Sequence, residues 1–180
     1  MTLYNNLVTG NWTIADDLSY TGCYYTVIYN NVITGTSSFT NNGTNTLFES
    51  NGGGTANTYN GNTSFTAPNS GPLSVSNGSA STFNGNLTVN RTAIGSTQFF
   101  GVGAVITGNF SYTNNTSGPS TFGTVSVANT IGGTVNIAAS YTTHSGFTIY
   151  RLINQTAGGT HTIQNPYGFD FKKDKLKITT

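Results

Sequence analysis

Residues 59–66 read YNGNTSFT, and residues 83–90 read FNGNLTVN. Aligning the chain on the glycine of this motif gives seven copies: LVTGNWTI (7–14), VITGTSSF (32–39), YNGNTSF (59–65), FNGNLTV (83–89), ITGNFSY (106–112), IGGTVNI (131–137) and AGGTHTI (157–163). The glycines are Gly10, Gly35, Gly61, Gly85, Gly108, Gly133 and Gly159, separated by 25, 26, 24, 23, 25 and 26 residues. Seven copies in nearly constant register indicate an internal repeat.

The motif alternates between apolar and polar residues, as expected of a strand with one buried face. The position two before the glycine holds Val8, Ile33, Tyr59, Phe83, Ile106, Ile131 and Ala157. The position four after it holds Ile14, Phe39, Phe65, Val89, Tyr112, Ile137 and Ile163. Both columns are predicted to face the interior. The glycine is predicted to share that face and to mark a bend or a narrow part of the core.

The intervening positions predict two outward ladders of short polar side chains. The first holds Asn11, Thr36, Asn62, Asn86, Asn109, Thr134 and Thr160. The second holds Thr13, Ser38, Ser64, Thr88, Ser111, Asn136 and Thr162. Stacked strands place such residues about 4.8 Å apart. All of them except Asn136 are candidate ligand-binding residues.

A strand that recurs at this interval, with no room for a helix, predicts an all-β parallel β-solenoid. We expect about seven coils of 23–26 residues, two or three strands per coil and a right-handed path. Further strand candidates are TLFES (46–50), PLSVS (72–76), TQFFGV (97–102) and GFTIYRLI (146–153). The alternative is an antiparallel sandwich, which does not require glycine to return in register. Residues 1–164 would form the solenoid, and the charged segment 165–180 a C-terminal cap or a junction to another domain.

Charge is scarce: 6% of residues are Asp, Glu, Lys or Arg, and the net charge is +1. This balance argues against a nucleic-acid partner. In-register stacking explains the scarcity, because a charge repeated in every coil would repel itself. No apolar run is long enough to span a membrane, and the first twenty residues lack the features of a secretory signal.

Few residues could carry chemistry. The acidic residues are Asp16, Asp17, Glu49, Asp170 and Asp174, and the histidines are His144 and His161. The adjacent Asp16 and Asp17 would point to opposite faces of a strand, Glu49 stands alone in its coil, and no spacing matches a zinc motif. The single Cys23 lies among apolar neighbours, which favours a buried thiol. We therefore expect no enzyme, no metal site and no cofactor.

The Thr-, Asn- and Gly-rich repeats of the form NGNLTV resemble repetitive β-helical regions of bacterial surface adhesins of the Bacteroidetes type, and of phage and viral fibres. The resemblance implies an extracellular, cell-surface or virion-surface location. It also implies a structural or adhesive role, with self-association or neighbouring repeat modules as partners. One alternative is a β-solenoid whose outward ladders bind carbohydrate, such as surface glycans, or ice. A carbohydrate-active enzyme on a β-helix is a further alternative.

Overall fold

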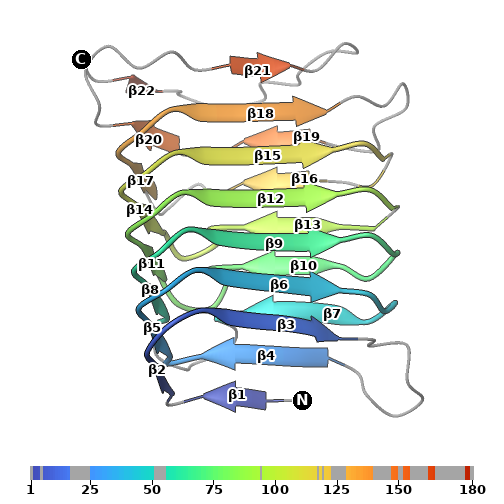
Figure 1. Ribbon diagram of the computed structural model, residues 1–180. Helices are drawn as coiled ribbons and strands as arrows, with labels where there is room; N and C mark the ends of the chain where they lie inside the picture. Colours follow the sequence, from blue (N-terminus) through green and yellow to red (C-terminus); the bar gives the residue numbers. More distant parts are fainter. Residues whose placement is uncertain are drawn as a thin grey trace.

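The computed structural model describes residues 2–4, 6–16, 25–50, 56–93, 95–116, 118, 120–122, 129–139, 147–149, 152–154, 162–164 and 177–178. Within these ranges the regular structure consists of β-strands, which form three parallel sheets stacked coil upon coil (Figure 1). We call them sheets A, B and C, in the order in which the chain visits them.

Sheet A has seven strands: β1 (Thr2–Tyr4), β4 (Tyr25–Tyr29), β7 (Thr46–Glu49), β10 (Leu73–Val75), β13 (Thr97–Phe99), β16 (Ser120–Phe122) and β19 (Phe147–Ile149). Sheet B has eight: β2 (Leu7–Val8), β5 (Val32–Ile33), β8 (Thr58–Tyr59), β11 (Thr82–Phe83), β14 (Val105–Ile106), β17 (Asn129–Ile131), β20 (Leu152–Asn154) and β22 (Lys177–Ile178). Sheet C has seven: β3 (Trp12–Asp16), β6 (Ser37–Asn41), β9 (Thr63–Ala67), β12 (Leu87–Arg91), β15 (Phe110–Asn114), β18 (Val135–Ala139) and β21 (Thr162–Gln164).

The strand pairing confirms the parallel β-solenoid. Each strand pairs in parallel with the strand one coil away, as β9 does with β6 and β12. Because every pairing of the described strands is parallel, the antiparallel sandwich is wrong. The right-handed path stays a prediction.

The two predicted apolar columns lie in the core, together with side chains of sheet A such as Leu47, Leu73 and Phe99. The buried members are Ile33, Tyr59, Phe83, Ile106 and Ile131 in sheet B, and Phe39, Phe65, Val89, Tyr112 and Ile137 in sheet C. Aromatic rings stack along the axis, with centroids 5.0 Å apart for Phe39 and Phe65 and 5.0 Å for Tyr59 and Phe83. The alternation of the motif therefore places the core correctly.

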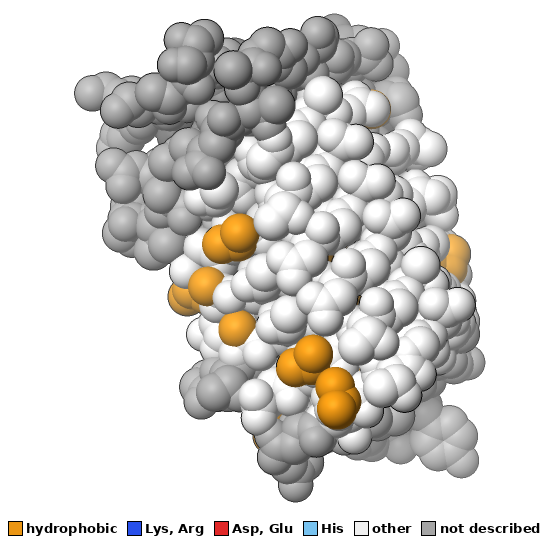
Figure 2. All heavy atoms as spheres, turned by 60° about the vertical axis from the view of Figure 1, so that its left-hand side comes forward, with side chains coloured by type: hydrophobic (Ala, Val, Ile, Leu, Met, Phe, Trp, Pro, Cys, Tyr) orange, Lys and Arg blue, Asp and Glu red, His pale blue; other side chains and the backbone are white. Residues whose placement is uncertain are grey.

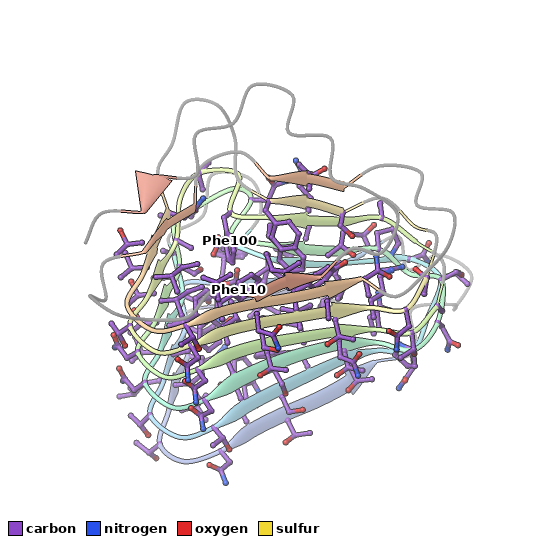
Figure 3. The ribbon with its side chains drawn as sticks, turned by 90° about the horizontal axis from the view of Figure 1, so that it is seen from above. Phe100 and Phe110 are labelled. Carbon is purple, nitrogen blue, oxygen red and sulfur yellow. The ribbon has the colours of Figure 1, made fainter. Side chains whose placement is uncertain are left out.

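At the corner after sheet A the backbone turns through the left-handed region. Phe100 has a φ of 59° there, which is uncommon for a bulky residue. Its ring lies inside the coil and meets Phe110 edge-on, with centroids 5.3 Å apart (Figure 3). Packing of the ring against the core offsets the strain of the backbone.

The glycine column needs one correction. The glycines lie at the corner between sheets B and C, and a Cβ on Gly35 or Gly61 would point along the axis into the preceding coil rather than into the core. A Cβ on Gly35 would approach the carbonyl oxygen of Gly10 to 2.3 Å, and one on Gly61 would approach that of Gly35 to 2.4 Å. Glycine is required because successive coils touch at this corner.

The seventh copy needs another correction. Asn154 of β20, and not Ala157, stands opposite Ile131, and Ile178 of β22 follows it. Thr162 nevertheless stands opposite Asn136 as expected. Thr162 follows Asn154 by eight positions, whereas Asn136 follows Ile131 by five, so the spacing along the sequence between sheets B and C is larger in this coil. Ala157 and Gly159 themselves lie outside the described residues.

Candidate functional site

The two outward ladders lie where the sequence places them. Asn11, Thr13, Thr36, Asn62, Asn86, Thr88, Asn109 and Thr134 are exposed, and Ser38, Ser64 and Ser111 are half-buried. Thr160 lies outside the described residues, and only the backbone of Thr162 is described, in β21. That these residues bind a ligand stays a prediction.

The ladder at the corner between sheets B and C also joins the coils. The Asn11 amide oxygen accepts a hydrogen bond from the backbone N–H of Thr36 at 3.0 Å. Those of Asn62 and Asn86 accept from the residue one coil further on, at 3.0 and 2.8 Å. The amide oxygen of Asn109 accepts from the backbone and the hydroxyl of Thr134 at 2.8 and 3.0 Å. The side-chain oxygen of each of these asparagines therefore holds two successive coils together.

The outer surface is uncharged over the described residues. Glu49 and Arg91 are the charged residues whose side chains the structure describes, and both are buried. Figure 2 shows the face over sheet B as polar with scattered apolar side chains. Leu7, Val32 and Val105 are exposed there, in register with Thr58 and Thr82. Such a surface offers hydroxyls, amides and methyl groups to a partner.

A second column of polar residues, which the repeat pattern did not reveal, lies at the corner between sheets A and B, exposed at Asn6 and buried at Asn31, Asn57 and Ser81. The amide oxygen of Asn31 accepts from the backbone and side-chain nitrogens of Asn6 at 3.0 and 2.9 Å. The amide oxygen of Asn57 accepts in the same way from Asn31, at 2.9 and 3.0 Å. The backbone N–H of Asn57 donates to the Ser81 hydroxyl at 3.1 Å. All of these residues stand four positions before a repeat glycine, a spacing that could have revealed the column.

Glu49 lies beside this column and is fully buried. Its Oε1 accepts hydrogen bonds from Asn57 Nδ2 at 2.6 Å, Ser81 Oγ at 2.6 Å and the Tyr59 hydroxyl at 3.3 Å. Its Oε2 accepts from the backbone and hydroxyl of Ser76 at 2.7 and 3.4 Å. Glu49 is thus a carboxyl surrounded by donors, which the sequence analysis described only as isolated.

Burial raises the pKa of the Glu49 carboxyl above its ordinary value, and the hydrogen bonds from Ser81, Asn57, Ser76 and Tyr59 oppose this shift in part. Burial and the neighbouring carboxyl raise the pKa of Tyr59. Tyr59 therefore remains a neutral donor at physiological pH. The cluster combines a proton acceptor, a hydroxyl and an amide in a dry environment.

Arg91 is the second buried charge. Its guanidinium donates to the carbonyl oxygens of Gly71 at 3.1 Å, Ser96 at 3.2 Å and Ser70 at 3.4 Å, and to the Thr97 hydroxyl at 3.4 Å. Its Nε has no hydrogen-bond partner within the described ranges. These contacts tie together the turns of two successive coils.

The remaining candidates for chemistry do not come together in the described part of the chain. No group of three metal-ligating side chains occurs there. Asp17, Cys23, His144 and His161 lie outside it, and Asp16 is described only by its backbone in β3. Within those same ranges, the structure contains no helix of the length and apolarity that a bilayer crossing requires.

Comparisons with protein-family models, with curated proteins and with solved structures gave no match to this chain.

Proposed function

We propose that the chain is a non-catalytic structural or adhesive module of an extracellular or virion-surface fibre or filament. The observation that carries the proposal is the continuous stacking of three sheets, joined from coil to coil by backbone and asparagine hydrogen bonds. Each coil contacts its neighbours along one axis, as in other solenoids, so the architecture is that of a rod segment. Neighbouring repeat modules or further copies of the chain are its partners.

Location tests the first half of this proposal. Antibodies against the chain, used for immunogold electron microscopy on unpermeabilised source cells or particles, should label the outer surface. Labelling that appears only after permeabilisation would contradict the proposal.

Mechanical strength tests the second half. When a single molecule is pulled from its two ends, we expect force peaks spaced by about one coil, because each coil detaches from the next. Smooth extension without force peaks would contradict a mechanical role for the rod.

A second candidate function is ligand binding by the outward ladders, with carbohydrate or ice as the target. The exposure of eight ladder residues and the absence of charge on the described surface favour it. A glycan array and a thermal-hysteresis assay test it. Thr88→Lys, in the middle of the ladder, should abolish any signal, whereas Thr92→Lys, an exposed residue at the following corner, should preserve it. Silence of the unmodified protein in both assays rejects this candidate.

A further inference from the structure

Glu49, Asn57 and Ser81 form a cluster that a scaffold role leaves unexplained. We propose that Ser81 and Asn57 join in an intramolecular ester, which the protein forms by itself with Glu49 as the proton carrier. The bond would link two successive coils at the corner between sheets A and B. It is independent of the proposed surface function.

Ser81 is placed as the nucleophile. Its hydroxyl donates to Glu49 Oε1 at 2.6 Å, within the range in which a carboxylate acts as a general base. The hydroxyl oxygen also accepts a hydrogen bond from the backbone N–H of Asn57 at 3.1 Å. Ser81 is thus held against Asn57, the residue that it would attack, and its hydroxyl proton is already hydrogen-bonded to the base Glu49.

Asn57 is placed as the acyl donor. Its Nδ2, the leaving group, donates to the same Glu49 oxygen at 2.6 Å. Its Oδ1 accepts two hydrogen bonds from Asn31, at 2.9 Å from the backbone nitrogen and 3.0 Å from Nδ2. Two donors on the amide oxygen stabilise the negative charge that develops there when a nucleophile adds to the carbon, as in an oxyanion hole.

The step balances without another reactant. Ser81 Oγ attacks Asn57 Cγ, and the hydroxyl proton passes to Glu49 Oε1. Glu49 then delivers this proton to Asn57 Nδ2, the Cγ–Nδ2 bond breaks, and ammonia leaves. An Oγ–Cγ ester remains, Glu49 returns to its ionised form, and no atom is oxidised or reduced.

The surroundings favour this reaction over hydrolysis. Glu49, Asn57 and Ser81 are fully buried, as is Asn31, which donates to the Asn57 amide oxygen. Bulk water therefore does not reach the acyl carbon. A base and a nucleophile fixed in one place react far faster than the same groups free in solution. Because burial raises the pKa of Glu49, the ionised carboxylate is also a stronger base than one in water.

The chain contains a natural comparison. Asn114 Nδ2 donates to the Ser120 hydroxyl at 2.9 Å, and both residues are buried. The other described partner of that hydroxyl is the Tyr112 hydroxyl, at 2.6 Å, and not a carboxylate. An asparagine side chain and a serine hydroxyl lie together in both clusters, in direct contact at Ser120 and through the shared Glu49 Oε1 at Ser81. Among the described residues a carboxylate contacts only the Ser81 hydroxyl of the two, so no bond is expected at Ser120.

Intact-mass spectrometry of the purified full chain tests the proposal. The protein without substitutions should be lighter than its sequence mass by one ammonia. Digestion should give a linked pair of peptides that contain Asn57 and Ser81, and hydroxylamine should separate them. Ser81→Ala should have its full sequence mass, whereas Ser120→Ala should still lack one ammonia.

Three results would overturn the proposal. The first is a full sequence mass for the protein without substitutions. The second is an ammonia loss that persists in Ser81→Ala, since this would indicate a succinimide at an asparagine. The third is an ammonia loss that persists in Glu49→Gln, with circular dichroism showing that the variant is folded. If Glu49→Gln does not fold, the Ser81 and Ser120 variants decide the matter.

Discussion

Glu49 stands in sheet A where the coils on either side place Ile28 and Val75. A carboxyl in this position gives up its hydration, and the loss is tolerable only if hydrogen bonds replace the water. The five hydrogen bonds that it accepts supply this replacement. The part of the desolvation cost that these hydrogen bonds do not offset raises the pKa of Glu49. The raised pKa makes the stability of the fold depend on pH.

The sign of this dependence follows from the shift. The folded state holds the Glu49 proton more tightly than the unfolded state, where the pKa is near its ordinary value of 4.5. The Glu49 contribution to the free energy of unfolding is therefore complete below pH 4.5 and declines as the pH rises through the raised pKa of the folded state. We expect the urea midpoint to fall across this interval. Tyr59, the ionisable residue in contact with Glu49, stays neutral there.

Glu49→Gln is the matched variant for this titration, with Ser81→Ala as the background of both proteins so that the proposed ester forms in neither. It cannot ionise, so its urea midpoint should vary much less with pH over the same interval. It places an amide N–H₂ against donors and should be less stable by about 1–3 kcal/mol, the cost of a buried unsatisfied donor. An equal pH dependence in both proteins would show that groups other than Glu49 cause it.

At the scale of the element, the corner between sheets B and C limits the choice of residue most strongly. Gly61→Ala would place a Cβ 2.4 Å from the carbonyl oxygen of Gly35, which belongs to the backbone and cannot move without shifting a coil. We expect this variant to lose about 1–3 kcal/mol of unfolding free energy, as overpacked sites do. Urea denaturation followed by circular dichroism measures the loss.

Asn60→Ala is the control for this variant because it changes the preceding residue at the same corner. Asn60 is exposed, and its amide oxygen accepts a hydrogen bond from Asn84 Nδ2 at 2.8 Å. Because this hydrogen bond is exposed, the substitution should cost about 0.5 kcal/mol or less. If Gly61→Ala were as stable as Asn60→Ala, the coils would not be in contact at the glycine column.

The elements differ in how well the sequence predicts them. In the first six copies sheets B and C follow from the motif because a fixed number of residues separates their inward columns from the glycine; in the seventh, Asn154 takes the place predicted for Ala157. The strands of sheet A, three to five residues long, are less regular, since the number of residues between them and the preceding strand of sheet C varies, from four before β7 to eight before β4. This register brings Glu49 beside Ser76 and Ser81, which belong to another coil. The buried cluster could therefore not be predicted from repeat spacing alone.

Over the whole molecule, the described surface has no charged side chain, and stacking gives a physical reason. A residue on the outside of sheet C lies directly against its counterparts one coil above and below, as Thr88 does against Ser64 and Ser111. Adjacent strands are about 4.8 Å apart, so identical charges in a column would be held close together. Serine, threonine and asparagine fill such columns without this repulsion.

A column of introduced lysines tests this explanation. Ser64→Lys, Thr88→Lys and Ser111→Lys should each change stability by about 0.5 kcal/mol or less, as surface substitutions usually do. The triple variant should lose more than the sum of the single losses, because each adjacent pair adds up to about 1 kcal/mol of repulsion in water. Added salt at about 1 M should remove the excess, since the screening length is then about 3 Å. Urea midpoints of the four variants at low and high salt measure both effects. Losses that add up at both salt concentrations would mean that charge repulsion between coils does not account for the neutral surface.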